Sequence, residues 1–482
     1  MKRSLNMGMI KDYSINPDEF SPERAKAAVR IMTNRDFCNG IDDVRRAGII
    51  YLPKPIPEMS NLEYRNFLFQ TEMFPSASKT LQSFIGLSFR KPPTMASPSD
   101  RYDLDTIVTS DGRTVEQLAR TVMFEHAVCN DGGLLIDQSA EWVAGMSQAD
   151  VEAMQLEPMI SVYPAENVRD IVWTVKGTRK TMTLVRLMDD LKTARHLSLE
   201  NGVYTVTIYE KRDPLWVKTQ VYTPKLNGMT LDYIPFVPLN DGDHGAPMDD
   251  ICATNHTHYL TSASLTTALN WIKHPVMVVT GVAEGTSLQC RSGALWTIEE
   301  PNAKWGWNEY KGDGVPALER HLERLEDHMA KLGSRMLGAE KNVAEAAETL
   351  ARRQVTEGSI LAAMCRHVSS IVEKALRMKA DWSGVAGDQV HFACNTDFEP
   401  LRMDGRLLAQ IDILHDKCKL TDRELFDLLQ KSEFIPETAD FDARQTELES
   451  KTVDVPIAPP IIPTGYQLTA SGNGSDAPAK GK

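Results

Sequence analysis

Residues 315–382 limit the fold more than any other stretch, because their pattern predicts two helices joined by a short link. Leucine or methionine recurs at alternating spacings of four and three residues from Leu318 to Met336. This spacing gives an a/d seam, which is narrower than the apolar stripe of an ordinary surface helix. Pro316 suits the first helical turn, where its missing N–H is not needed. We therefore predict a helix over 316–336 that packs against other helices.

The second helix of this hairpin is predicted to be unusually long. Asn342 and Glu345 have the spacing of a capping box, and no proline follows until Pro400. Apolar residues recur at helical spacing as far as Trp382. A helix over 343–382 would extend roughly 60 Å at 1.5 Å per residue. The same periodicity fits a long helix in an α-rich enzyme, so the hairpin says more about structure than about function.

The remaining chain predicts an α+β fold that is mostly helical. N-cap and capping-box spacings at Ser21, Ser60 and Thr114 predict helices in the amino-terminal part. Alternating apolar residues over about 158–240 predict a meandering antiparallel sheet between helical blocks. A helix over 248–273 is crowded with small hydroxyl and amide side chains, so it packs closely on neighbours or faces water.

Short strands and helices are predicted on either side of residues 315–382. Residues 276–307 predict a compact β-rich stretch that ends with Trp305 and Trp307, and 390–394 predict a short strand. Helices are expected over 401–414 and after Thr421, which has a capping partner in Glu424. The proline-rich run at 456–463 and the final residues predict an extended, disordered tail.

Composition excludes several classes of protein. The chain has 42% hydrophobic and 25% charged residues, which is typical of a soluble globular protein. No apolar run approaches the ~18 residues that a membrane-spanning helix needs, so no membrane partner is expected. Seven cysteines without a CxxC pair predict reduced thiols and neither a disulfide nor a zinc framework. The net charge of −13 argues against tight binding of DNA through its phosphates.

No motif for catalysis is present in the sequence. There is no P-loop, no G-x-S-x-G, no H-E-x-x-H and no G-x-G-x-x-G. His256 and His258 would point about 200° apart on a helix, which argues against a shared metal ion. The acidic pairs at 189–190 and 249–250 are typical of turns or helix N-termini, and Cys365 is expected in the core. We expect no catalytic residue, no cofactor and no metal site, which favours a binding or structural role.

Charges on the 316–336 helix form separate stripes. Glu319 and Glu323 are a like-charge pair four residues apart, and Arg320 and Arg324 are another. Separate stripes suit a head-to-tail ring in which the acids of one subunit face the bases of the next. A solvated face with accidental segregation fits them as well. On the ring hypothesis, the subunit interface comprises Glu319, Arg320, Glu323, Arg324, Leu325, Met329 and Leu332.

The order of these parts resembles that of the portal, or head–tail connector, proteins of tailed bacteriophages. The stretch from Ile49 to Pro93 is similar to the amino-terminal signature of one portal-like branch. Its motifs are Tyr51-Leu52-Pro53, the pair Glu63 and Tyr64, and Gly86 through Pro93. Further matches are IPFVPLN at 234–240, HYLTSAS at 258–264 and PVMVVTG at 275–281. The resemblance extends from about residue 20 to residue 435.

The resemblance implies a dodecameric ring at one capsid vertex, through which DNA is packaged and later ejected. It implies that the partners are double-stranded DNA in transit, terminase, capsid and scaffolding proteins, and head-completion or tail adaptor proteins. The protein would be assembled in the host cytoplasm and reside in the virion. It would not be an enzyme, because the packaging ATPase would be a separate protein.

The resemblance also assigns a role to each part of the chain. These parts are a wing over 1–245, stem helices over 246–274 and 316–336, a clip over 275–315, a long wing helix over 343–382, a crown-like region over 383–450 and a tail over 451–482. Between the second stem helix and the long helix, the tunnel loop would comprise Leu337, Gly338, Ala339, Glu340, Lys341 and Asn342. This loop and the crown-like region are both shorter than the family pattern. An alternative of a different class is an oligomeric coiled-coil scaffold or adaptor that does not contact DNA.

Overall fold

The computed structural model contains two compact units, residues 1–398 and residues 399–482. It describes residues 16–96, 107–138, 156–213, 215–226, 228–240, 245–273, 276–280, 302, 304–308, 311–337, 347–396, 398, 405–417, 419–432, 434–436 and 439–452. Within these residues, no helix combines the length and the apolar character that crossing a bilayer requires. Helices and sheets both occur in the first unit, so the predicted α+β class is confirmed.

The helices predicted at Ser21, Ser60 and Thr114 form, among a larger set of amino-terminal helices. They are α1 (Pro22–Asn39), α2 (Ile41–Ala47), the 3₁₀ helix η1 (Gly48–Ile50), α3 (Asn61–Gln70), α4 (Ser76–Ser88) and α5 (Val115–Val128). Ser60 and Glu63 form a complete capping box at α3, as do Thr114 and Gln117 at α5. Ser21 precedes α1, but its side chain makes no capping hydrogen bond.

The β part contains two separate larger sheets. One is a five-stranded antiparallel meander of β4 (Val168–Lys176), β5 (Arg179–Met188), β6 (Thr193–Glu200), β7 (Val203–Arg212) and β8 (Leu215–Tyr222). The other has β2 (Gly132–Asp137) between β3 (Met159–Pro164) and β11 (Phe236–Pro238). The prediction that β3 begins the meander is wrong, because β3 pairs with β2 along its whole length. Strand β6 was not predicted, since charged residues interrupt its alternation.

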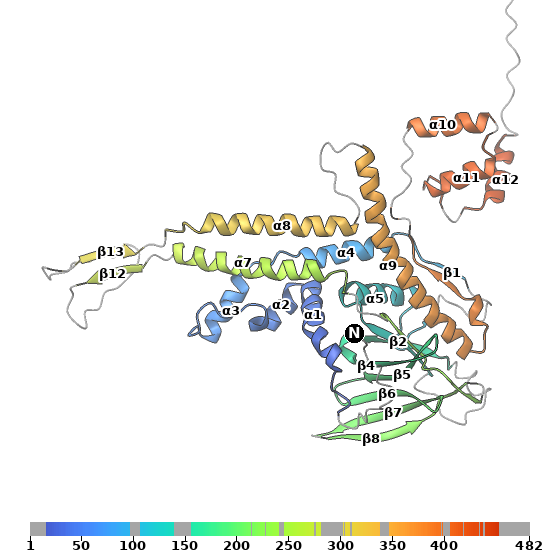
Figure 1. The fold of residues 1–482 in the computed structure, drawn as a ribbon. Helices are drawn as coiled ribbons and strands as arrows, with labels where there is room; N and C mark the ends of the chain where they lie inside the picture. The colour runs from blue at the N-terminus through green and yellow to red at the C-terminus, as the bar shows by residue number, and fades with distance from the viewer. Residues whose placement is uncertain are drawn as a thin grey trace, which may run out of the picture. The chain divides into compact units, whose positions relative to one another are not determined.

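Both helices predicted over residues 315–382 are present, and the first of them also forms an antiparallel hairpin with an earlier helix (Figure 1). Helix α7 (Asp249–Lys273) leads into the paired strands β12 (Val276–Thr280) and β13 (Lys304–Asn308), and α8 (Val315–Leu337) returns beside α7. Helix α9 (Ala347–Trp382) has 36 residues, which correspond to about 54 Å. It packs against α5 and the β2 sheet, with Cys365 fully buried as expected. Residues 338–346, where the predicted start of this helix falls, lie outside the described residues.

The carboxy-terminal part begins later than the sequence predicts. Strand β14 (His391–Ala393) pairs with β1 (Thr94–Ala96), so residues 383–398 belong to the first unit and not to a crown-like region. The second unit contains α10 (Gly405–Asp416), α11 (Asp422–Lys431) and α12 (Phe441–Thr452). Thr421 and Glu424 form the predicted capping box of α11, whereas α12 was not predicted. Residues 453–482, the expected disordered tail, lie outside the described residues.

Candidate assembly surface on the α7–α8 hairpin

The a/d seam of α8 is the face on which this helix packs within its own chain. Met329 is fully buried, Leu318, Leu322 and Leu325 are half-buried, and the helix packs mainly against α7. Leu332 packs against the main hydrophobic core. The prediction that Met329 belongs to a subunit interface is therefore wrong, because it has no surface left for a second chain.

A histidine–glutamate pair joins the two helices near the middle of the hairpin. The Nε2 atom of His258 on α7 lies 3.2 Å from Oε1 of Glu326 on α8. The His258 side chain is only 6% exposed, whereas Glu326 is 45% exposed. The ring of Phe74 covers the imidazole at a centroid distance of 5.6 Å. This pair fixes the register of α8 along α7, and sequence reasoning did not find it.

Two polar residues anchor α7 to the amino-terminal helices. Asp249, in its first turn, accepts hydrogen bonds from Arg30 at 2.8 Å and Asn34 at 2.6 Å, both on α1. Asn255 is fully buried, where its amide donates to the Phe74 carbonyl at 2.9 Å and accepts from the Ala77 N–H at 3.1 Å. The 249–250 pair thus lies at a helix N-terminus, as expected, and Asp249 holds that end of the hairpin.

Five of the seven serine and threonine side chains of α7 are satisfied by their own helix. Each bonds to the carbonyl four residues earlier, at 2.8–3.1 Å; the donors are Thr254, Thr257, Thr261, Ser264 and Thr267. Their hydroxyl groups therefore need no partner outside the helix. This agrees with the prediction of a helix that packs closely on neighbours or faces water.

The charged stripes of α8 are exposed. Arg320 donates to the Pro316 carbonyl at 3.0 Å, and Arg324 donates to the Arg320 carbonyl at 3.4 Å. Among the residues that the structure describes, no ion pair involves either arginine or the neighbouring Glu319 and Glu323. These four charges therefore remain available to a partner, and their place in a subunit interface stays a prediction.

The H-x-H pair on α7 does not form a joint site. His256 contacts the Tyr51 carbonyl at 3.0 Å, on the α1–α2 side of α7, whereas His258 faces Glu326 on α8. The two rings diverge because positions two residues apart on a helix differ by about 200°. No group of three or more metal-ligating side chains occurs in the described part of the chain.

The predicted tunnel loop falls almost wholly outside the described residues. Leu337 is the last residue of α8, and the next helix, α9, begins at Ala347. Gly338, Ala339, Glu340, Lys341 and Asn342 all lie between these ends, beyond what the structure describes. Their role in a DNA channel stays a prediction.

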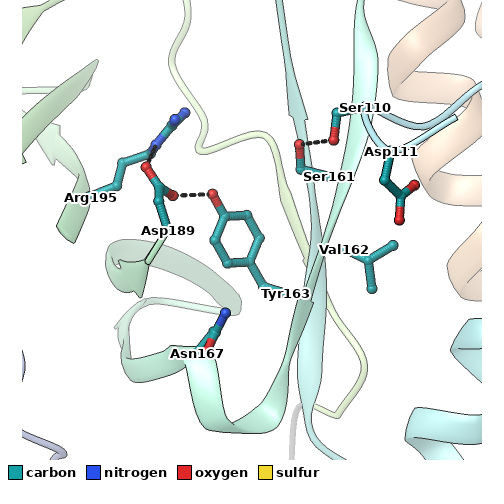
Figure 2. A pocket seen from close by; sticks show the side chains of 8 residues that line it. All are labelled: Ser110, Asp111, Ser161, Val162, Tyr163, Asn167, Asp189 and Arg195. Carbon is teal, nitrogen blue, oxygen red and sulfur yellow. Dashed lines mark hydrogen bonds and ion pairs between the residues drawn. The ribbon is translucent and has the colours of Figure 1, made fainter. Parts of the chain in front are cut away.

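A polar cavity of about 330 Å³ lies at the edge of the β2 sheet (Figure 2). Tyr163 donates to Asp189 at 2.5 Å, and Arg195 bonds to both Asp189 and Asp137. Burial raises the pKa of the Asp137 carboxyl and of the Tyr163 phenol. Tyr163, Asp189 and Arg195 are bonded to one another, which indicates a structural cluster.

Asp190, the second acid of the predicted 189–190 pair, accepts hydrogen bonds from backbone N–H groups in the β5–β6 turn, as expected.

Comparisons with known proteins cover different parts of the chain. Residues 247–383 match a family model described as a domain of unknown function (DUF4055), and this range spans α7, the β12–β13 pair, α8 and α9. No curated protein matches the sequence.

Two solved structures of GTA particles are similar to the chain. The neck of an empty GTA particle, computed with C6 symmetry, is 12% identical, with 80% of this chain and 98% of that chain covered at a TM-score of 0.36. The neck of a native GTA particle, computed with C12 symmetry, is also 12% identical, with 78% and 94% covered at a TM-score of 0.35. TM-scores at this level do not by themselves establish a shared fold.

Proposed function

We propose that this chain is the ring-forming portal subunit of a tailed-bacteriophage particle and forms the channel for DNA packaging and ejection. The observation that carries this proposal is the order of elements in the hairpin. Two antiparallel helices flank a two-stranded β element, and a 36-residue helix follows directly. This is the stem, clip, stem and long-helix order that the sequence resemblance implies.

The charge of the chain supports a channel through which DNA passes without being held. Each phosphate that a channel neutralises adds sequence-independent affinity and hinders sliding, so an acidic chain suits passage. The net charge is −13. In this proposal the protein has no catalytic residue, cofactor or metal ion, and a separate ATPase drives packaging.

The partners follow from this arrangement. The β12–β13 end of the hairpin would contact terminase during packaging and head-completion or tail adaptor proteins afterwards. The wing would contact capsid and scaffolding proteins at one vertex, in a ring of twelve copies assembled in the host cytoplasm. The wing comprises most of the first unit, with the five-stranded sheet and α9.

The coiled-coil scaffold is the weaker alternative. A coiled coil between chains needs an apolar seam that is free to meet a second chain. In α8 this seam lies against α7 of the same chain, and its central Met329 is fully buried. The seam is therefore already used inside the subunit.

The test is the assembly state of the purified protein. We expect native mass measurement and negative-stain class averages to show a closed ring with a central channel wide enough for duplex DNA. A monomer or two-fold dimer at micromolar concentration and low salt would contradict the proposal. Oligomers without a channel would favour the scaffold.

A further inference from the structure

Helix α3 carries a free face that is apolar and basic. Leu62 and Phe69 are each 70% exposed, and Arg65 lies between them at helical spacing and is exposed as well. The opposite side of the helix buries Phe67 and Leu68. Arg65 has no ion-pair partner among the described residues. An arginine between two exposed large apolar side chains is typical of a protein–protein contact.

Contacts of α7 show at what height along the hairpin this face lies. Gln70, the last residue of α3, accepts a hydrogen bond from Asn270 on α7 at 3.3 Å. The carboxy-terminal end of α3 therefore lies beside α7 near residue 270. Phe69 directly precedes Gln70, so this end of the free face is at the same height.

The acidic stripe of α8 lies at this height too. His258 on α7 meets Glu326 on α8, and Ile272 on α7 lies against Gly312 just before α8. The two contacts are therefore 14 residues apart along each arm of the hairpin. Counting along this register places Glu323 level with Thr261, and Glu319 level with Leu265. Both glutamates are exposed and have no ion-pair partner among the described residues.

The two surfaces lie on different sides of α7. Asn270, which faces α3, is on one side of the helix, and His258 and Ile272, which face α8, are on another. At 3.6 residues per turn these sides are roughly 140° apart. One chain therefore cannot bring Arg65 to its own Glu319 and Glu323.

A ring with the hairpin along its axis brings these surfaces together. Neighbouring subunits in a ring are related by rotation, so each offers two different surfaces at the same height. We infer that the free face of α3, made of Leu62, Arg65 and Phe69, binds a second copy of this chain, with Arg65 pairing with Glu319 and Glu323 of the neighbour's α8. This inference rests on the proposed ring and names a contact that closes it.

Charge reversal with rescue tests the contact. We expect Arg65→Glu to raise the protein concentration at which half of the rings dissociate by at least tenfold, and the double variant Glu319→Arg/Glu323→Arg to do the same. Combining all three substitutions should restore assembly to within about threefold of the wild type. The matched control is Arg179→Glu, which makes the same change at an exposed position at the start of β5 and should leave assembly unchanged.

The outcomes separate this contact from the ring itself. A wild-type monomer would refute the proposed function. Wild-type rings that assemble equally well with Arg65→Glu would overturn the α3 contact and leave the ring in place. Disruption by both charge reversals without rescue by the triple variant would overturn the pairing of Arg65 with these glutamates.

A cross-linking experiment tests the same contact without a change of stability. With Arg65→Cys and Glu323→Cys in one chain, oxidation by diamide should link neighbouring copies into a ladder on a denaturing gel. Each single variant is the control, since the native cysteines that the structure describes are all buried. Bands of a single chain only, from rings of the double variant, would overturn the inference.

Discussion

At the scale of single residues, the side chain of Asn255 on α7 binds the backbone at the start of α4. Helix α4 has no side-chain cap of its own, because Pro75 occupies the N-cap position. The Asn255 carbonyl oxygen accepts from the Ala77 N–H, one of the orphan donors of that first turn, while its NH₂ group donates to Phe74. A residue of α7 therefore caps α4 from outside.

We expect Asn255→Leu to lower the free energy of unfolding by about 3 kcal/mol, because a buried donor and a buried acceptor lose their partner. Urea unfolding monitored by circular dichroism measures the change. Thr257→Ala is the control, since its exposed hydroxyl bonds only to its own helix; it should change stability by less than about 0.5 kcal/mol. Equal stability of the two variants would show that Asn255 is not an anchor.

Two buried histidines make stability depend on pH. Burial lowers the pKa of His126 to about 4, helped by the adjacent His367, whose ring centroid is 4.6 Å away. Burial and the neighbouring Arg186 lower the pKa of His196 to about 4 as well. Both rings are neutral above pH 6.5 in folded and unfolded chains. Between pH 6.5 and 4 the unfolded chain takes up the protons first, so stability falls as the pH falls.

Each histidine should cost about 3 kcal/mol by pH 4, since one pKa unit corresponds to about 1.4 kcal/mol. Urea midpoints between pH 7.5 and 5 test this, in a window where most carboxylates stay ionised. His126→Gln should make the decline shallower, whereas His391→Gln, at an exposed position, should not. An unchanged slope for His126→Gln would contradict the assignment.

At the scale of elements, the α8 seam determines how the hairpin holds together. Leu325 is half-buried in the a/d seam of α8, the helix that packs against α7. Leu325→Asp should place an unpaired charge there and cost several kcal/mol locally. Hydrogen exchange should show faster exchange of α8 amides, with the five-stranded sheet still protected. Asp327→Asn, at an exposed position of α8, is the control. Unchanged protection of α8 in Leu325→Asp would mean that this residue faces solvent.

Sequence periodicity predicted the elements better than their partners. Capping boxes at Ser60, Thr114 and Thr421 marked helix starts correctly, because these signals are local in the chain. Strand β3 was placed in the wrong sheet, since alternation shows that a strand exists but not which strand it pairs with. The a/d seam likewise predicted a packed face without saying whether α7 or a second chain covers it. The surface of α3 gave no motif, because exposed Leu62 and Phe69 become informative only once burial is known.

At the scale of the whole molecule, the proposed function depends on how copies of the chain surround DNA. The acidic net charge limits what each subunit contributes to binding, so contact with DNA would have to come from a few positions. Lys341 is the only basic residue in the predicted tunnel loop, 337–342. In a ring, each subunit would supply one such lysine between the end of α8 and the start of α9.

We expect Lys341→Glu to leave ring assembly intact and to reduce the length of DNA that is packaged or retained per particle. A belt of lysines makes weak, salt-screened contacts with phosphate, which slow passing DNA without holding it, and glutamates would repel the same phosphates. Lys341→Arg is the matched control, because it keeps the charge and should package normally. Packaged length and retention are measured by gel analysis of DNA from purified particles at two salt concentrations. The difference between the variants should shrink at the higher salt, and equal packaging and retention by both would show that the loop does not engage DNA through this residue.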